Sequence, residues 1–133
     1  MRFIFVDTSG WFATVSRRDS DHGSARKFFE VNRFPFFTTD YVIDETVTLM
    51  QGRLGHAIAV RFLDSVQSSA RVILYYLSKG EIEEGIQLFR NRPDKGWSLT
   101  DCTSFVLMKH RRIREAFAFD EHFQQAGFEM LPE

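Results

Sequence analysis

The chain has 133 residues, of which 44% are hydrophobic and 26% are charged, and its formal net charge is −1. This length fits one domain, and the supply of apolar side chains is large enough for a core, which excludes a disordered chain. A protein that only binds nucleic acid usually has a basic surplus, which is absent here. Any nucleic-acid role must therefore depend on local basic patches or on bound cations.

Cys102 is the only cysteine, so an intrachain disulfide and a zinc site built from cysteines are excluded. The first residues have neither the apolar stretch nor the cleavage site of a signal peptide. No apolar run approaches the roughly 18 residues of a membrane span. We therefore expect a cytoplasmic protein with no membrane partner.

The first part of the chain alternates apolar runs with amphipathic segments. Residues 3–6 predict a buried strand, and residues 7–16 carry apolar side chains at the spacing of a short helix. A second helix is expected over 21–31. The brief apolar run 35–38 predicts the second strand.

Helical spacing extends over 40–54 and resumes over 56–68, and Gly55 is expected to break or bend the chain between the two segments. Residues 72–77 give the clearest strand signal, because they are rich in β-branched and aromatic side chains. The amphipathic segment 78–92 predicts another helix, which ends before a proline.

A helix is expected over 98–111, and strands are expected over 116–119 and 128–131. Strands that alternate with helices predict an α/β fold, here one domain over 1–133 with a mainly parallel four- or five-stranded sheet flanked by helices. Ligands of such sheets lie outside the carboxyl ends of the strands. Reactive residues at those ends therefore indicate the site.

Four acidic residues are expected at that edge of the sheet. Asp7 and Asp120 directly follow predicted strands, Glu45 lies in the second turn of a predicted helix, and Asp101 lies in the first turn of another. Crowded carboxylates need a counter-charge, because like charges raise one another's pKa. All-oxygen ligation suits Mg²⁺ or Mn²⁺, and two such ions can hydrolyse a phosphodiester. We predict that these four acids are the metal-binding and catalytic residues.

Each acid also has an ordinary structural explanation. Asp7 could cap the following helix, Asp120 could cap a turn, and Asp101 completes a capping-box pattern with Ser98. Glu45 could simply face solvent. These alternatives stay open at the level of sequence.

The neighbours of these acids give weaker indications. Helical periodicity favours Glu45 over Asp44 as the inward-facing acid, because Glu45 borders apolar positions. His122 could approach a phosphate, although an exposed turn is its expected position. None of the four histidines shows metal-ligand spacing relative to the others.

Four motifs occur in order along the chain: Phe5–Ser9 with Asp7, Tyr41–Thr46 with Glu45, Ser98–Cys102 with Asp101, and Phe119–Phe123 with Asp120. With these motifs the chain resembles the PIN-domain ribonucleases, especially the VapC-type toxins of VapBC toxin–antitoxin pairs. The resemblance covers nearly all 133 residues. It implies a Mg²⁺- or Mn²⁺-dependent endoribonuclease that forms a homodimer and is inhibited by a small antitoxin protein.

The chain departs from the family pattern at one corner of the expected site. Many relatives have Ser or Thr one or two residues before the last aspartate, where this chain has Ala118 and Phe119. Thr8, Ser9 and Thr100 are the nearby hydroxyls that could hold a ligand water.

Other functions compete with the nuclease. A catalytically silent PIN-like binding module shares the fold. A phosphorylatable receiver domain usually has paired acids after its first strand, where this chain has only Asp7. A phosphatase with an Asp-x-Asp start is disfavoured, because Ser9 occupies the second acidic position. The identity of the RNA and of the antitoxin is not encoded in these motifs.

Overall fold

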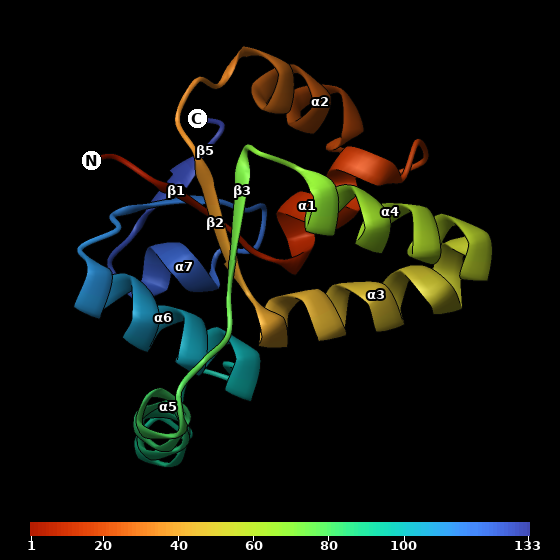
Figure 1. The fold of residues 1–133 in the computed structure, drawn as a ribbon. Coiled ribbons are helices and arrows are strands. Elements are labelled where there is room, and N and C mark those ends of the chain that lie inside the picture. Colours follow the sequence, from red (N-terminus) through yellow and green to blue (C-terminus); the bar gives the residue numbers. More distant parts are fainter.

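A computed structural model describes residues 1–133, which form five strands and seven helices (Figure 1). In chain order the elements are β1 (Ile4–Val6), α1 (Thr8–Val15), α2 (His22–Val31), β2 (Phe36–Thr39), α3 (Asp40–Leu54), α4 (His56–Ser68), β3 (Val72–Tyr75), α5 (Lys79–Asn91), α6 (Leu99–Arg111), β4 (Glu115–Phe117), α7 (His122–Gln125) and β5 (Glu129–Leu131). No helix has the length and apolar character needed to cross a membrane.

The five strands form one parallel sheet in the order β3-β2-β1-β4-β5. This confirms the expected α/β fold with a mainly parallel sheet. The strand order runs outward from β1 in two directions, to β2 and β3 on one side and to β4 and β5 on the other. A crevice therefore opens between the chain segments that leave β1 and β4, at the carboxyl ends of these strands.

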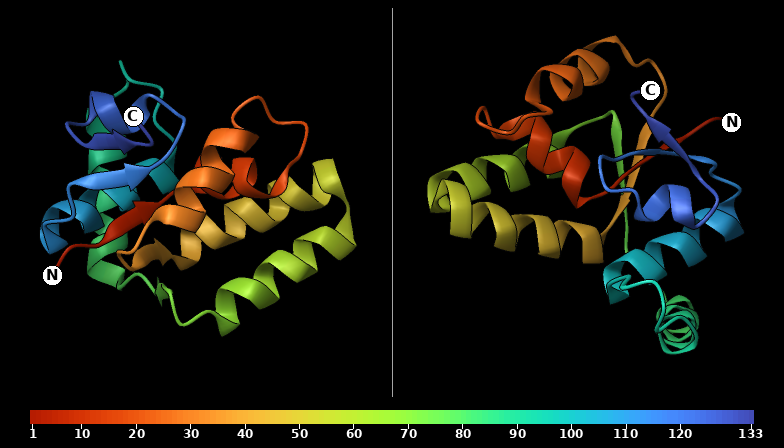
Figure 2. Two further views of the ribbon diagram at one scale, coloured as in Figure 1. Left: turned by 90° about the horizontal axis from the view of Figure 1, so that it is seen from above. Right: turned by 180° about the vertical axis from the view of Figure 1, so that it is seen from behind.

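Helices cover both faces of the sheet (Figures 1 and 2). On one face, Phe36 and Phe117 meet aromatic rings from α1 and α2, including Trp11 at 6.4 Å and Phe28 at 4.8 Å between ring centroids. On the other face, Phe5 of β1 lies 6.1 Å from Phe123 of α7. Burying an aromatic side chain of this size contributes roughly 2–3 kcal/mol, so these rings fix the sheet between its two helical layers.

Three details differ from the expectations. The strand expected over 72–77 ends at Tyr75. The strand expected over 116–119 ends at Phe117, because the residues beyond it leave the regular pairing with β1; only the N–H of Ala118 still donates to Leu131 of β5. The four-residue helix α7 was not expected, since it is too short to show helical periodicity. The break at Gly55 is confirmed: α3 ends there with a positive φ of 98°.

Candidate active site

The carboxyl ends of the two central strands bring Asp7 and Asp120 to the same crevice. Asp7 directly follows β1, and its N–H donates to the carbonyl of Phe117 at the end of β4. Asp120 lies in the loop that leaves β4. Helix α1 begins close against this loop, because Gly10 has no side chain; an added Cβ would lie 2.3 Å from the Phe117 oxygen.

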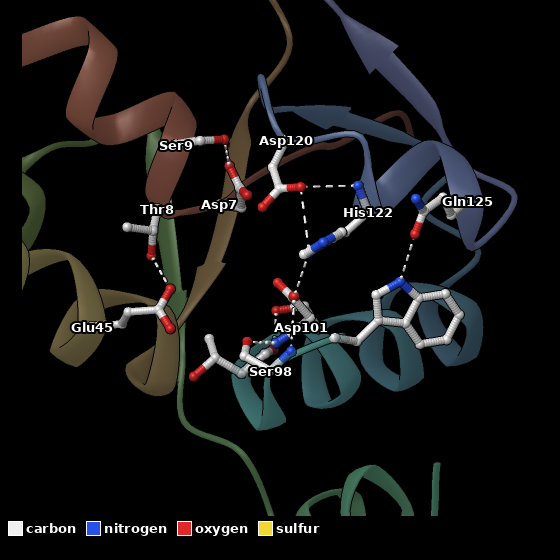
Figure 3. A network of polar contacts seen from close by, with 12 residues as sticks. Asp7, Thr8, Ser9, Glu45, Ser98, Asp101, Asp120, His122 and Gln125 are labelled. Carbon is white, nitrogen blue, oxygen red and sulfur yellow. Dashed lines mark hydrogen bonds and ion pairs between the residues drawn. The ribbon is translucent and has the colours of Figure 1, made fainter. Parts of the chain in front are cut away.

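Two helices that begin near the same edge supply Glu45 and Asp101. Helix α3 follows β2 directly and is capped by Thr39, whose hydroxyl accepts from the N–H of Val42. Its second turn carries Glu45 toward the crevice. Asp101 lies in the first turn of α6 (Figure 3).

These residues line a pocket of about 450 Å³. Six of the lining residues are acidic: Asp7, Asp19, Asp21, Glu45, Asp101 and Asp120. No lysine or arginine lines it, and His122 is its only basic side chain. A phosphodiester cannot approach so concentrated a negative charge unless cations neutralise it.

Asp7 and Glu45 each use one carboxylate oxygen within the protein. Oδ1 of Asp7 accepts hydrogen bonds from Oγ of Ser9 at 2.7 Å and from the N–H of Gly10 at 3.1 Å. Oε1 of Glu45 accepts from Oγ1 of Thr8 at 2.7 Å. The second oxygen of each carboxylate has no hydrogen-bond donor from the protein.

Asp101 and Asp120 follow the same pattern. Oδ2 of Asp101 accepts from the N–H of Ser98 at 3.0 Å and lies 2.9 Å from Nδ1 of His122. Oδ1 of Asp120 accepts from the N–H of His122 at 3.0 Å and lies 3.3 Å from the same Nδ1. Each of these carboxylates again keeps one oxygen without a protein donor (Figure 3).

Burial raises the pKa of Asp7 to about 7. The hydrogen bonds from Ser9 and Gly10 oppose this shift, whereas the negative charges of Asp101 and Asp120 add to it. A buried acid beside two other acids ionises poorly without a counter-charge. A divalent cation in the pocket would supply that counter-charge.

The chemical type of the available donors, carboxylate oxygens, fits a hard cation. Oxygen ligands from several carboxylates are those that Mg²⁺ and Mn²⁺ take, and each of the four predicted acids has one oxygen to offer. In the present arrangement no three His, Cys, Asp or Glu side chains converge closely enough to hold an ion. The structure thus brings the four acids to one pocket, and their role as metal ligands stays a prediction.

The structure distinguishes between the two neighbouring acids of α3. Glu45 lines the pocket and is partly buried, whereas Asp44 is exposed and lies outside it. The capping interpretations also hold: Asp7 caps α1, and Asp101 forms a capping box with Ser98. Capping occupies one oxygen of each acid, so the other oxygen can still bind a cation.

The expected exposed turn position of His122 is wrong. Its side chain is 28% exposed and lies against two of the predicted acids. Asp19 and Asp21 also line the pocket, although the sequence did not single them out. Both lie in the loop between α1 and α2, whose path no periodic pattern reveals.

A hydroxyl from α1 occupies the corner where the family's Ser or Thr is replaced by Ala118 and Phe119. Oγ of Ser9 accepts from the N–H of Phe119 at 2.9 Å while it donates to Asp7. Thr100 does not line the pocket. Ser9 therefore links the loop after β4 to the first acid.

Comparisons with known proteins confirm the family resemblance. A family model for the PIN domain matches residues 4–129. The 23S rRNA-specific endonuclease VapC20, from two strains of Mycobacterium tuberculosis, is 34% identical over 131 residues, which are 98% of this chain and 99% of the relative. The crystal structure of M. tuberculosis VapC20, a sarcin-ricin loop cleaving toxin, matches with a TM-score of 0.89 at 32% identity and covers 94% of this chain and 95% of that chain. On these matches, the chain belongs to the PIN-domain family.

Proposed function

We propose that this protein is a metal-dependent endoribonuclease that cuts RNA at the pocket between β1 and β4. One observation carries the proposal: four carboxylates from four separate parts of the chain face one pocket, and each has one oxygen held by the protein and one left free. This pattern holds the acids in place and leaves a set of hard oxygen donors for Mg²⁺ or Mn²⁺.

The relatives support RNA as the substrate. VapC20 is named for cleavage of 23S rRNA, and its crystal structure is that of a sarcin-ricin loop cleaving toxin. The similarity extends over nearly the whole length of both chains. We propose ribosomal RNA as the first substrate to test, and we propose that the protein is the toxin of a toxin–antitoxin pair.

The residues of the chain divide the chemical task. Asp7, Glu45, Asp101 and Asp120 would hold the metal, which when bound lowers the pKa of a water molecule and neutralises charge on the phosphate oxygens. Ser9 and Gly10 fix the Asp7 carboxylate, and Thr8 fixes Glu45. A carboxylate held in this way needs little rearrangement to bind the cation.

Adjacent acids of α3 provide a matched test. Glu45→Gln is expected to reduce metal-dependent RNA cleavage by about 100-fold or more, because losing a metal ligand should cost more than losing a group that only supports one, which costs about 10- to 100-fold. Asp44→Asn removes the same charge from an exposed position and should cleave like the wild type. Cleavage is measured with Mn²⁺ and with EDTA.

Two outcomes would contradict this proposal, the first for Glu45 alone and the second for the nuclease as a whole. Equal cleavage by both variants would remove Glu45 from the site. A wild-type protein that neither binds Mn²⁺ nor cleaves RNA would indicate a silent PIN-like module instead.

A second pocket offers a surface for the antitoxin. It has a volume of about 610 Å³ and lies between α1 and α4, with Trp11, Phe29 and Phe62 among its apolar lining residues. Three arginines also line it: Arg17, Arg18 and Arg61. An apolar segment with acidic side chains fits this combination, and a protein partner supplies such a segment more readily than RNA does.

Helix α1 separates this groove from the catalytic pocket. Trp11 lines the groove, whereas the next residue, Phe12, lines the pocket of acids. A partner seated in the groove would thus lie one helix away from the proposed metal ligands. Homodimerisation and a cytoplasmic location stay predictions, and light scattering of the purified protein tests the first.

A further inference from the structure

His122 holds two of the predicted metal ligands at once. Its Nδ1 lies 2.9 Å from Oδ2 of Asp101 and 3.3 Å from Oδ1 of Asp120. These acids come from different elements, the first turn of α6 and the loop after β4. Since an ionised carboxylate oxygen only accepts hydrogen bonds, Nδ1 carries the hydrogen and donates it to Asp101, and Asp120 lies within ion-pair distance of the same nitrogen.

The position of the imidazole is fixed by the core. The next residue, Phe123, is completely buried. Its ring packs 6.1 Å from Phe5 of β1 and 5.0 Å from Phe105 of α6, between ring centroids. The short helix α7 is thereby packed against the sheet and α6. This packing holds the backbone of His122, at the start of α7, beside the pocket.

Asp120 depends on this contact more than Asp101 does. The side chain of Asp120 is 39% exposed, and within its own loop it is held only by the N–H of His122. The side chain of Asp101 is 13% exposed and is also held by the capping box with Ser98. The imidazole therefore lies between the looser acid and the better-held one and contacts both.

We propose that His122 is a positioning residue for the metal site: its Nδ1 donates to Asp101, and the ring lies against Asp120, which also accepts from the His122 N–H. This inference rests on the proposed nuclease function. The ring contacts the oxygens that already accept hydrogen bonds from the protein, Oδ2 of Asp101 and Oδ1 of Asp120, so a cation can bind the other two oxygens without displacing the ring. Hydrogen bonds to ligating carboxylates of this kind raise metal affinity.

Three substitutions separate the two ring nitrogens. The amide nitrogen of Asn occupies a position close to Nδ1, and that of Gln occupies a position close to Nε2. His122→Ala and His122→Gln should weaken Mn²⁺ binding by about tenfold or more, and RNA cleavage should fall with it. His122→Asn should bind Mn²⁺ nearly as the wild type does. Binding is measured by isothermal titration calorimetry on the full chain without RNA.

His110→Ala serves as the matched control. His110 also pairs with a carboxylate, at 2.9 Å from Glu84, but on the exposed surface between α5 and α6. This variant should bind Mn²⁺ like the wild type. Circular dichroism of each variant reports the fold independently of the metal.

The outcomes separate this inference from the function on which it rests. Mn²⁺ binding by His122→Ala that equals or exceeds that of the wild type would overturn the positioning role and leave the nuclease standing. If His122→Gln kept Mn²⁺ binding and His122→Asn lost it, the assignment of the donor to Nδ1 would be overturned. A wild-type protein without Mn²⁺ affinity would overturn the nuclease itself, and the positioning role with it.

Discussion

At the scale of single residues, Asp7 and Asp101 each serve two purposes through different oxygen atoms. Oδ1 of Asp7 caps α1, and Oδ2 of Asp101 caps α6. The remaining oxygens have no protein donor. Capping at a helix N-terminus also places the acid in a favourable field, because the positive end of the helix dipole stabilises its negative charge. The cap thus orients the carboxylate that a cation would use.

Asp7→Asn is expected to abolish RNA cleavage and to stabilise the metal-free protein at high pH. Asn caps about as well as Asp, so Ser9 and Gly10 keep their acceptor. The variant loses the anionic oxygen that a hard cation favours. It also loses an acid whose pKa burial raises to about 7.

The sign of the stability effect follows from the proton balance. An unfolded Asp has a pKa of about 3.9. Between that value and about 7 the folded wild type binds the proton and the unfolded chain has lost it, so the free energy of unfolding falls as the pH rises through this window. The loss is on the order of 4 kcal/mol above pH 7, and the Asn variant avoids it.

Urea unfolding in EDTA at about pH 4 and about pH 8 measures this difference. The free energy of unfolding of the variant should exceed that of the wild type only at the higher pH. Asp44→Asn, which changes an exposed acid, should give the wild-type pH profile. Parallel pH profiles for the wild type and Asp7→Asn would show that Asp7 ionises normally, and full cleavage by the variant would show that it is only a cap.

At the scale of the elements, strand positions followed from short apolar runs, whereas the exact ends did not. Phe119 continues the apolar run of β4, yet pairing with β1 stops at Phe117. Apolar character reflects burial and says nothing of hydrogen bonding, so the buried Ala118 and the partly buried Phe119 look like part of the strand. The helix α7 has only four residues, too few for periodicity to appear.

The same limit explains what sequence reasoning found of the site. Acids that follow strands were predictable, because parallel strands end at one edge of the sheet. Asp19 and Asp21 were missed as pocket residues, because their positions depend on the path of an irregular loop, and His122 was expected in an exposed turn because the short helix α7 gives no periodic signal. Asp19 and Asp21 are separated from α1 by a turn that carries no apolar pattern.

The two capping boxes of the chain allow a comparison of helix starts. Ser98 and Asp101 cap α6 at the pocket, and Ser78 and Glu81 cap α5 away from it. Ser98→Ala and Ser78→Ala should each lower the free energy of unfolding by about 1 kcal/mol, since each removes one bond to a helix N–H. Only Ser98→Ala should weaken Mn²⁺ binding, because only its helix carries a predicted ligand.

Calorimetric Mn²⁺ titrations and urea unfolding of the two variants test this expectation together. Equal Mn²⁺ affinities at equal loss of stability would mean that the start of α6 does not position a ligand. Weaker binding by both variants would trace the effect to general loss of stability.

At the scale of the whole molecule, the near-neutral net charge conceals a separation of charges. The catalytic pocket has six acids and no lysine or arginine. The groove on the other side of α1 has three arginines and no acid. The acidic pocket would repel RNA until cations had bound there, whereas the arginine-lined groove would attract an acidic polypeptide.

This separation predicts that partner binding and catalysis can be uncoupled. Arg61 is exposed on α4 and lines the groove but not the catalytic pocket. Arg61→Glu should weaken binding of the proposed antitoxin partner by about tenfold or more, because reversal of a charge at an interface costs more than its removal. Metal-dependent RNA cleavage should stay at the wild-type rate, and the antitoxin should no longer suppress it.

Arg33→Glu is the control, since Arg33 is exposed and lines neither the groove nor the catalytic pocket. It should bind the antitoxin and cleave RNA as the wild type does. Binding is measured by calorimetry, and cleavage is measured with and without an excess of antitoxin. If Arg61→Glu instead lost cleavage while it kept antitoxin affinity, the groove would be a path for RNA and the antitoxin would bind elsewhere. Unchanged antitoxin affinity with unchanged cleavage would remove the groove from both roles.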